Sequence, residues 1–543
     1  MRRWQAQEPI AARPDSAAYR LAKFVRRHRL GVAAGGVAAL ALSMLTLLSL
    51  AQAWRAERAE KLAQQRSAQA DDLLGFMLGE FADKLRPIGR LELLASVGSK
   101  AIAHLSESPN VNSPSAASAH SILQRAKALT VLGEVSVAKR ELDAALTPLQ
   151  AARRLLAADP PATAHEHANA ALLADWRKAQ GTAAFWVGHA YYTKRQFAPA
   201  RAAWDDYEHY SRQWLLAAPG QFEPTVELSY ALSNLGTLLM DEGHLSEAAE
   251  RIRASIALKQ QALALKPLDL PLQAELANSL SLLGTALLWQ GEFQPAQALF
   301  EQGLQAIVSA RQQAPRDLEW AYREAAMRQW LGQAALKLDD RARARSAFQA
   351  VIAVTQSLLQ QEPKNRRWWQ LQSRAEVALA NLQAPSPADT RHLQELMAEL
   401  DALDAGSGGA AATRRLPLRA QASLGLSRQL QAQQQTPAAI DTLTQTLALL
   451  RAAANRQPED LPLQVESGAV RLALSALYEQ THDRLAAQTQ CIAVEQELRD
   501  LRPLLRLHHE ITRLWVQAHS CLNQAGQVQQ EQSWLQQRGK PSV

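Results

Sequence analysis

The sequence has few of the residues on which disulfide scaffolds, zinc sites and β-sheets depend. Only Cys491 and Cys521 occur among 543 residues, too few for a cysteine-ligated zinc site or a disulfide-rich domain. Aromatic residues make up 6% of the chain and β-branched residues are sparse, which argues against extensive sheet. Ala, Leu, Gln, Arg and Glu dominate instead, and they favour helix. We therefore expect an all-α protein.

Motifs for catalysis are also missing. The stretches GVAAGG and GSGG lack the Lys-Ser/Thr that completes a phosphate-binding loop, and no kinase, Ser-His-Asp or Cys-His motif occurs. The histidine clusters His165-Glu166-His167 and His508-His509-Glu510 lack the HExxH spacing of a zinc site. We interpret both clusters as solvated surface residues. The prediction is a protein that is not an enzyme, with no cofactor and no metal.

The positive charge of the chain is concentrated at its N-terminus. The formal net charge is +7, and residues 1–29 hold eight basic residues against two acidic ones. The remaining chain therefore carries a net charge of only +1. This distribution argues against a nucleic-acid-binding surface and favours a basic arm beside a membrane.

A single long apolar segment follows this arm. Residues 30–51 contain no charged side chain, and at 1.5 Å per residue they span about 33 Å, enough for a bilayer core of about 30 Å. We predict a transmembrane helix over residues 30–53. The basic cluster FVRRHR directly precedes it, whereas AWRAERAEK after it mixes both signs. The positive-inside rule then places the N-terminus in the cytoplasm and the rest of the chain across the membrane.

Two features of this segment leave alternatives open. Ala51-Gln52-Ala53 has the form of a signal-peptide cleavage site, but a signal core usually has about 7–15 residues behind a short leader. We therefore favour a retained helix. Small residues at Gly31, Gly35, Ala39 and Ser43 recur every fourth position, which is common in membrane helices and also suits a homodimer through the transmembrane helix.

This topology would place the two cysteines in an oxidising compartment. Cys491 and Cys521 flank Pro503 at unequal distances, so on antiparallel helices they would lie within about two turns of the same level. A disulfide needs Cα atoms within roughly 7 Å. We favour two buried free thiols and leave the bridge open.

Internal repeats dominate the middle of the chain. Four segments align without a gap at Gly188, Gly236, Gly284 and Gly332, so the spacing is 48 residues each time. The prolines that close the units, Pro219, Pro267, Pro315 and Pro363, have the same spacing. Two independent markers in one register indicate a solenoid of helical hairpins. In the unit of Gly236 we expect helices near 224–241 and 245–265.

Each unit resembles a tetratricopeptide repeat: a Leu-Gly or similar pair, a polar turn, then Ala and a large apolar residue four apart. The usual unit has about 34 residues, so the resemblance implies a right-handed tetratricopeptide-like α-solenoid with extended 48-residue hairpins. It also implies that first helices line a concave groove for protein or peptide ligands. The groove candidates so implied are His189, Tyr192, Met240, Asp241, Trp289 and Lys337.

The pattern divides the chain into segments. We expect a basic cytoplasmic arm (1–29), the transmembrane helix (30–53), juxtamembrane helices (54–105), a linker (106–120), the tetratricopeptide-like array (121–403), a flexible break (404–415), and degenerate repeats with a cap (416–540).

A second resemblance covers about the first 100 residues. ARPDSAAYRLAKFVRRHR before the apolar span, and FMLGEFADKLRPIGRLELLASVGSKAIAHL after it, are similar to the membrane-proximal region of bacterial transmembrane serine/threonine kinases with tetratricopeptide C-termini. This resemblance implies a bacterial inner-membrane protein with a periplasmic repeat domain. A kinase would precede Met1, so we expect either a kinase-free scaffold or sensor, or the regulatory part of a kinase system.

Overall fold

The computed structural model describes residues 17–76, 93, 95–101, 119–160, 166–405, 409–457 and 460–538. Helices are the only regular secondary structure in these ranges, so the all-α prediction is confirmed for them. The chain divides into two compact units, Met1–Ala128 and Leu129–Val543, which are described separately below.

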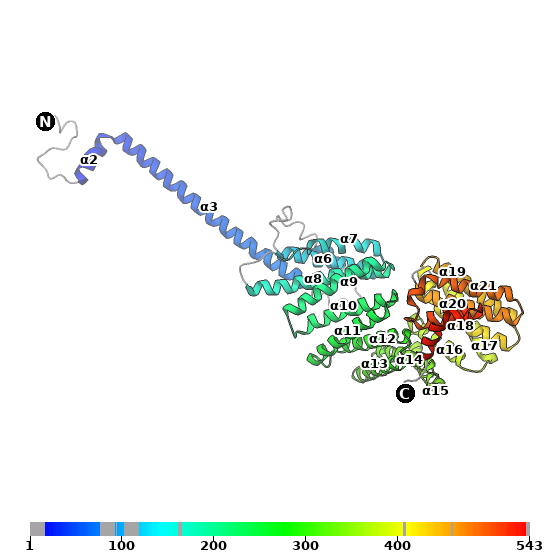
Figure 1. Ribbon diagram of the computed structural model, residues 1–543. Coiled ribbons are helices and arrows are strands. Elements are labelled where there is room, and N and C mark those ends of the chain that lie inside the picture. Colours follow the sequence, from blue (N-terminus) through cyan, green and yellow to red (C-terminus); the bar gives the residue numbers. More distant parts are fainter. Residues whose placement is uncertain are drawn as a thin grey trace, which may run out of the picture. The chain divides into compact units, whose positions relative to one another are not determined.

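The first unit contains a helix with the length and composition of a membrane span. After α2 (Ala17–Arg27), α3 runs without interruption from Arg29 to Phe76 (Figure 1). Its part Arg29–Arg58 is long and apolar enough to cross a membrane, and none of its apolar stretch is buried in the protein. The predicted span at 30–53 lies within this helix, and residues 54–76 continue it as a polar helix.

Several predicted segments lie partly outside the described residues. These are the start of the basic arm (1–16), much of the juxtamembrane region (77–92 and 102–105) and nearly all of the linker (106–118). Residues 404–415 were expected to be a flexible break, but α17 ends at Ala405 and α18 begins at Gly409. Residues 409–415 are helical because the run GAAATRR is rich in helix-favouring alanine and arginine.

The second unit is an array of antiparallel helices that pack on their neighbours in chain order (Figure 1). The first helices, called A helices, are α6 (Ala119–Ala138, which begins in the first unit), α8 (Glu166–Thr193), α10 (Phe222–Asp241), α12 (Leu270–Trp289), α14 (Leu318–Lys337), α16 (Arg366–Leu382), α18 (Gly409–Ala432) and α20 (Leu461–Gln480). The second helices, called B helices, are α7 (Leu142–Leu155), α9 (Phe197–Ala217), α11 (Leu245–Leu265), α13 (Phe293–Gln313), α15 (Arg341–Gln361), α17 (Pro387–Ala405), α19 (Thr436–Ala454) and α21 (Arg484–Glu497). The described chain ends with η3 (Arg499–Leu504), α22 (His509–Cys521), η4 (Ala525–Val528) and α23 (Gln529–Arg538). This is the tetratricopeptide-like α-solenoid that the repeats predict, and α10 and α11 match their predicted bounds to within two residues.

The repeated glycines are the points where helices A and B of one hairpin touch. A Cβ added at Gly236 would lie 2.5 Å from Ile252 Cγ1, and one added at Gly284 would lie 2.5 Å from Phe300 Cε1. The other units repeat this pairing at an offset of 16 residues, as Gly188 with Trp204 and Gly332 with Phe348. Phe300 also stacks on Trp330 of the next unit, with ring centroids 5.9 Å apart, so this large side chain packs both within its own hairpin and against its neighbour.

Turns and caps follow the same period. The A–B turns contain a residue with positive φ at Arg195, Gly243, Gly291 and Asp339, a conformation that glycine adopts without strain. Asp269, Asp317 and Asn365 directly precede the A helices α12, α14 and α16, and their side chains accept hydrogen bonds from backbone N–H groups of the first turn. Each closing proline lies two residues before its cap, where it ends the preceding helix.

The A helices form the inner side of the array. Successive A helices pack against each other, as α10 on α12, α12 on α14, α14 on α16, α16 on α18 and α18 on α20. Successive B helices approach one another less closely. A stack whose A helices lie closer together than its B helices curves toward the A helices, so their free faces line the concave side.

Candidate protein-binding site

Tyr192 and Asp241, two of the predicted groove residues, lie in a polar cluster at the C-terminal ends of α8 and α10. The Tyr192 hydroxyl donates a 2.7 Å hydrogen bond to Asp241 Oδ2. Arg195 lies 3.5 Å from Asp241 and 3.1 Å from Asp460, which caps the distant helix α20. Burial raises the pKa of Asp241, and burial together with the neighbouring Asp241 raises the pKa of Tyr192. These side chains therefore bind one another and link α8 and α10 to α20.

Trp289 is covered by α22. Its ring stacks on His508 with centroids 5.7 Å apart, and His509 packs edge-on against Phe293 at 5.0 Å. Burial lowers the pKa of His508 to about 4, so this ring is neutral at pH 7. The expectation that His508-His509-Glu510 is a solvated cluster is wrong, because these residues form the contact between α22 and the turn from α12 to α13. His165 lies outside the described residues.

Lys337 forms an ion pair with Glu510 at the same contact. Burial opposes the ionisation of Glu510, but the hydrogen bond with His509 and the charge of Lys337 outweigh it and hold the Glu510 pKa well below its usual value. Arg538 of α23 pairs with Glu292 next to Trp289. We call residues 499–538 the C-terminal segment, and it covers the ends of α12 and α14.

The remaining two candidates, Met240 and His189, are covered to different extents by neighbouring side chains. Met240 is only 4% exposed and belongs to the core that runs from α10 to α14, so its side chain does not face a ligand groove. His189 is half-buried against Phe185 and Trp186 of its own helix, and burial lowers its pKa. The six candidates, which lie toward the C-terminal ends of α8, α10, α12 and α14, thus all contact other residues of this chain.

A disulfide fixes the C-terminal segment to the last hairpin. Cys491 of α21 and Cys521 at the end of α22 are bridged, with Cα atoms 6.3 Å apart. Our preference for two free thiols is wrong, because η3 turns the chain so that α22 packs directly on α21 and α20. The offset estimated from Pro503 assumed a simple hairpin, which the 3-10 turn at Arg499–Leu504 replaces.

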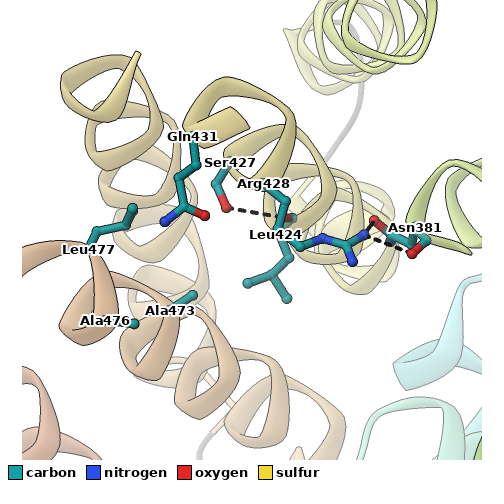
Figure 2. A pocket seen from close by; sticks show the side chains of 8 residues that line it. All are labelled: Asn381, Leu424, Ser427, Arg428, Gln431, Ala473, Ala476 and Leu477. Atoms are coloured by element: carbon teal, nitrogen blue, oxygen red, sulfur yellow. Dashed lines mark hydrogen bonds between the residues drawn. The ribbon is translucent and has the colours of Figure 1, made fainter. Parts of the chain in front are cut away.

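An open pocket of about 460 Å³ remains on the inner face, between α16, α18 and α20. Figure 2 shows its lining, with Leu424 pointing into the centre and α20 opposite. The lining residues are Asn381, Leu424, Ser427, Arg428, Gln431, Ala473, Ala476 and Leu477. Its volume lies in the range of about 300–1,000 Å³ that is typical of ligand sites. None of these residues is among the groove candidates predicted from the sequence.

Arg428 and Asn381 form the polar side of the pocket. The Arg428 guanidinium donates to the backbone oxygen of Asn381 at 3.1 Å and also to its Oδ1 (Figure 2). The Asn381 amide lies over Gly425, where an added Cβ would come 2.5 Å from Oδ1. Gly425 therefore gives the Asn381 side chain room to reach Arg428.

Neither arginine at this end of the pocket has an acidic partner. Arg341 donates a 2.7 Å hydrogen bond to the backbone oxygen of Leu382. Although Arg428 is exposed, partial desolvation of its side chain and the charge of Arg341 together lower its pKa. In the part of the chain that the structure describes, no carboxylate lies within 4.0 Å of either guanidinium. The pocket thus joins an apolar floor to an uncompensated positive charge.

Comparisons with known proteins find similar solved structures at low sequence identity. No family model matches the sequence, and no curated protein matches it. The apo form of RapI is 12% identical with a TM-score of 0.41, over 60% of this chain and 98% of that one. A Rap protein complexed with competence and sporulation factor has the same identity and TM-score, over 80% and 99%. TTC0263, a thermophilic TPR protein of Thermus thermophilus, is 21% identical with a TM-score of 0.27, over 46% and 99%. These scores are too low to support an argument about function.

The tetratricopeptide resemblance implies a register rule, by which the residues one, four and five positions after each repeat glycine face the groove. Applied to Gly425, the rule selects Leu426, Gln429 and Leu430, all of which are buried. Arg428 is three residues after the glycine, a position that the rule does not consider. An exposed arginine beside a marker glycine was the available signal, but its lack of an acidic partner is visible only in three dimensions.

Proposed function

We propose that this chain is a membrane-anchored interaction scaffold, in which α3 spans the membrane and the solenoid binds a segment of a partner protein. The observation that carries this proposal is the open pocket on the inner face of α16, α18 and α20. The rest of the inner face offers less, because the C-terminal segment already contacts Trp289 and Lys337. Binding rather than catalysis suits a site whose polar groups are arginine, amides and a hydroxyl.

The placement across a membrane is supported by two independent features. The exposed apolar stretch of α3 lies directly after the basic residues of α2, which favours a cytoplasmic N-terminus. The disulfide between Cys491 and Cys521 suits an oxidising compartment for the array. We therefore place the solenoid outside the cytoplasm, in the periplasm if the host is bacterial.

Site-specific cross-linking in intact cells tests the proposal. A photoreactive amino acid replaces Ala476, an exposed residue of the pocket lining, in the full-length protein. The matched control replaces Leu485, which is 77% exposed on the B helix α21. We expect a discrete protein adduct from position 476 that is absent from position 485. Equal labelling at both positions would refute a binding face on the A helices.

Topology needs a separate test. A reporter enzyme that is active only outside the cytoplasm is fused after Val543, and a second reporter that is active only inside it is fused at the same position. We expect activity from the first reporter alone. Activity from the cytoplasmic reporter alone would overturn the orientation without affecting the pocket.

A further inference from the structure

We propose that the pocket between α16, α18 and α20 binds a peptide segment in which a carboxylate side chain lies next to an aliphatic one, with Arg428 holding the carboxylate. This inference rests on the proposed scaffold function and names the chemistry of its ligand. Arg428, on the cationic side of the pocket, donates only to neutral oxygen atoms.

Among the described residues, no carboxylate pairs with the positively charged Arg428. Arg428 is exposed, and its hydrogen-bond acceptors are the two oxygens of Asn381. Arg341 adds a second positive charge nearby and also donates only to a backbone oxygen. A guanidinium matches a carboxylate with two parallel, charge-assisted hydrogen bonds, which are stronger than bonds to neutral oxygens. An incoming carboxylate can therefore replace Asn381 at a net gain.

Two other arginines of α18 and α20 differ from Arg428, because each has an acidic partner. Arg471, in the neighbouring helix α20, donates to Glu497 from Nη2 at 2.6 Å and from Nε at 3.0 Å. Arg415, in α18 itself, pairs with Asp404 at 2.6 Å. Arg428 has no such partner, although it borders the pocket.

The other side of the pocket selects an apolar group. Leu424 points into the centre, and Ala473 and Leu477 face it from α20 (Figure 2). Ala473 and Ala476 have small side chains, which leaves the space that the pocket occupies. An aliphatic side chain next to the bound carboxylate would cover this floor and remove it from water.

The remaining polar groups suit a peptide backbone. Gln431 extends toward Leu477 in Figure 2, and its Nε2 donates to Gln480 at 3.0 Å, so its carbonyl oxygen is free to accept an N–H group. The Asn381 amide, once released from Arg428, can donate to a carbonyl. A phosphate backbone would need a longer run of cations and would gain nothing from the leucine floor.

Peptide libraries give a direct test with the full-length protein in detergent micelles. Three immobilised libraries of blocked octapeptides are random except for a central pair fixed as Leu-Glu, Leu-Gln or Ser-Glu. We expect the Leu-Glu library to retain at least about tenfold more protein than either of the others, since both the charge and the side chain are recognised. Arg428→Gln should abolish the preference for Glu over Gln and keep the preference for Leu over Ser.

Two further variants make the result specific. Arg345→Gln removes an exposed arginine from the B helix α15 and should leave both preferences unchanged. Gly425→Ala pushes the Asn381 amide away from α18 and should weaken retention of the Leu-Glu library while keeping the preference for Glu. Melting temperatures of all variants show that the array is folded.

Three outcomes would overturn the inference. They are equal retention of the Leu-Glu and Leu-Gln libraries by the wild type, an unchanged preference in Arg428→Gln, and retention of none of the three libraries above a fourth, baseline library fixed as Ser-Gln. The cross-linking experiment tests the scaffold function separately. An adduct at position 476 without any preference among the libraries would mean that a partner binds through other chemistry.

Discussion

Lys259 offers a test of how this array tolerates a buried charge. Its side chain is 0% exposed, in α11, and its Nζ donates to three serine hydroxyls: Ser233 at 2.9 Å, Ser255 at 2.8 Å and Ser279 at 3.0 Å. No carboxylate lies within ion-pair distance in the described chain, although Tyr230 lies 5.3 Å from the ammonium group. Burial lowers the Lys259 pKa to about 8.

The cost of this charge follows from the two pKa values. The pKa falls from 10.5 in the unfolded chain to about 8 in the folded one, and at 1.36 kcal/mol per pH unit this disfavours folding by about 3 kcal/mol at pH 7. Because the folded pKa is the lower one, the unfolded chain binds more protons between about pH 8 and 10.5. Stability therefore rises with pH through this window, and the cost falls to about 1 kcal/mol near pH 10.

Lys259→Met keeps the aliphatic volume and removes the charge. The serines retain partners, since Ser233 lies 2.7 Å from Ser255 and Ser255 donates to the backbone oxygen of Ser229. We expect the variant to be more stable than wild type at pH 7 by about 1–2 kcal/mol, the charge cost offset in part by three lost hydrogen bonds.

Urea unfolding at pH 7, 8, 9 and 10, followed by circular dichroism, measures the difference between the two proteins. We expect the advantage of Lys259→Met to shrink by about 2 kcal/mol from pH 7 to pH 10. Lys364→Met, at an exposed lysine, is the matched control and should follow the wild type. A constant difference between Lys259→Met and wild type across this range would show that Lys259 is not a strained charge.

Three further changes test the packing. Gly236→Trp should destabilise the array by about 1–3 kcal/mol or more, because even a Cβ there lies 2.5 Å from a neighbouring side chain; an unchanged melting temperature would disprove the hairpin contact. Replacing Cys491 and Cys521 together by Ser should cost about 3–4 kcal/mol for a 30-residue separation, and labelling of the unfolded, unreduced wild type should find no free thiol. Glu510→Gln should speed hydrogen exchange in α22, because the ion pair with Lys337 is lost. The difference in exchange rate between variant and wild type should shrink as the pH falls from 4.5 through the lower folded pKa, where Glu510 itself becomes protonated. Equal exchange rates at pH 7 would mean that this ion pair does not hold the C-terminal segment.

The repeat architecture could be predicted because each hairpin is specified locally. A glycine, a turn residue with positive φ and a closing proline recur every 48 residues, and each acts within one unit. The bounds of α10 and α11 could therefore be predicted to within two residues. Helix α18 shows the limit of this reasoning, since a glycine-rich composition indicated a break where alanines extend the helix from Gly409.

The binding face could be predicted only in part. The side of each hairpin that faces inward follows from its register, and the A helices do line the inner side. Which inner residues are open depends on contacts between positions about 170–270 residues apart, such as Lys337 with Glu510 and Arg195 with Asp460. No local pattern encodes such contacts, so the sequence could name Trp289 as a groove candidate but could not predict its stacking on His508.

The contacts within the chain determine where on the inner face a partner would gain the most binding free energy. At Trp289 and Lys337, a ligand would have to displace an aromatic stack and an ion pair that the C-terminal segment already provides. That exchange gives little net free energy, because equivalent interactions are lost and formed. At Arg428, a carboxylate would replace only the neutral oxygens of Asn381, and a neighbouring aliphatic side chain would cover the partly exposed Leu424 and Ala473. The array therefore binds its own C-terminal segment at Trp289 and Lys337, whereas the pocket between α16 and α20 leaves Arg428 to pair with a carboxylate from a second molecule.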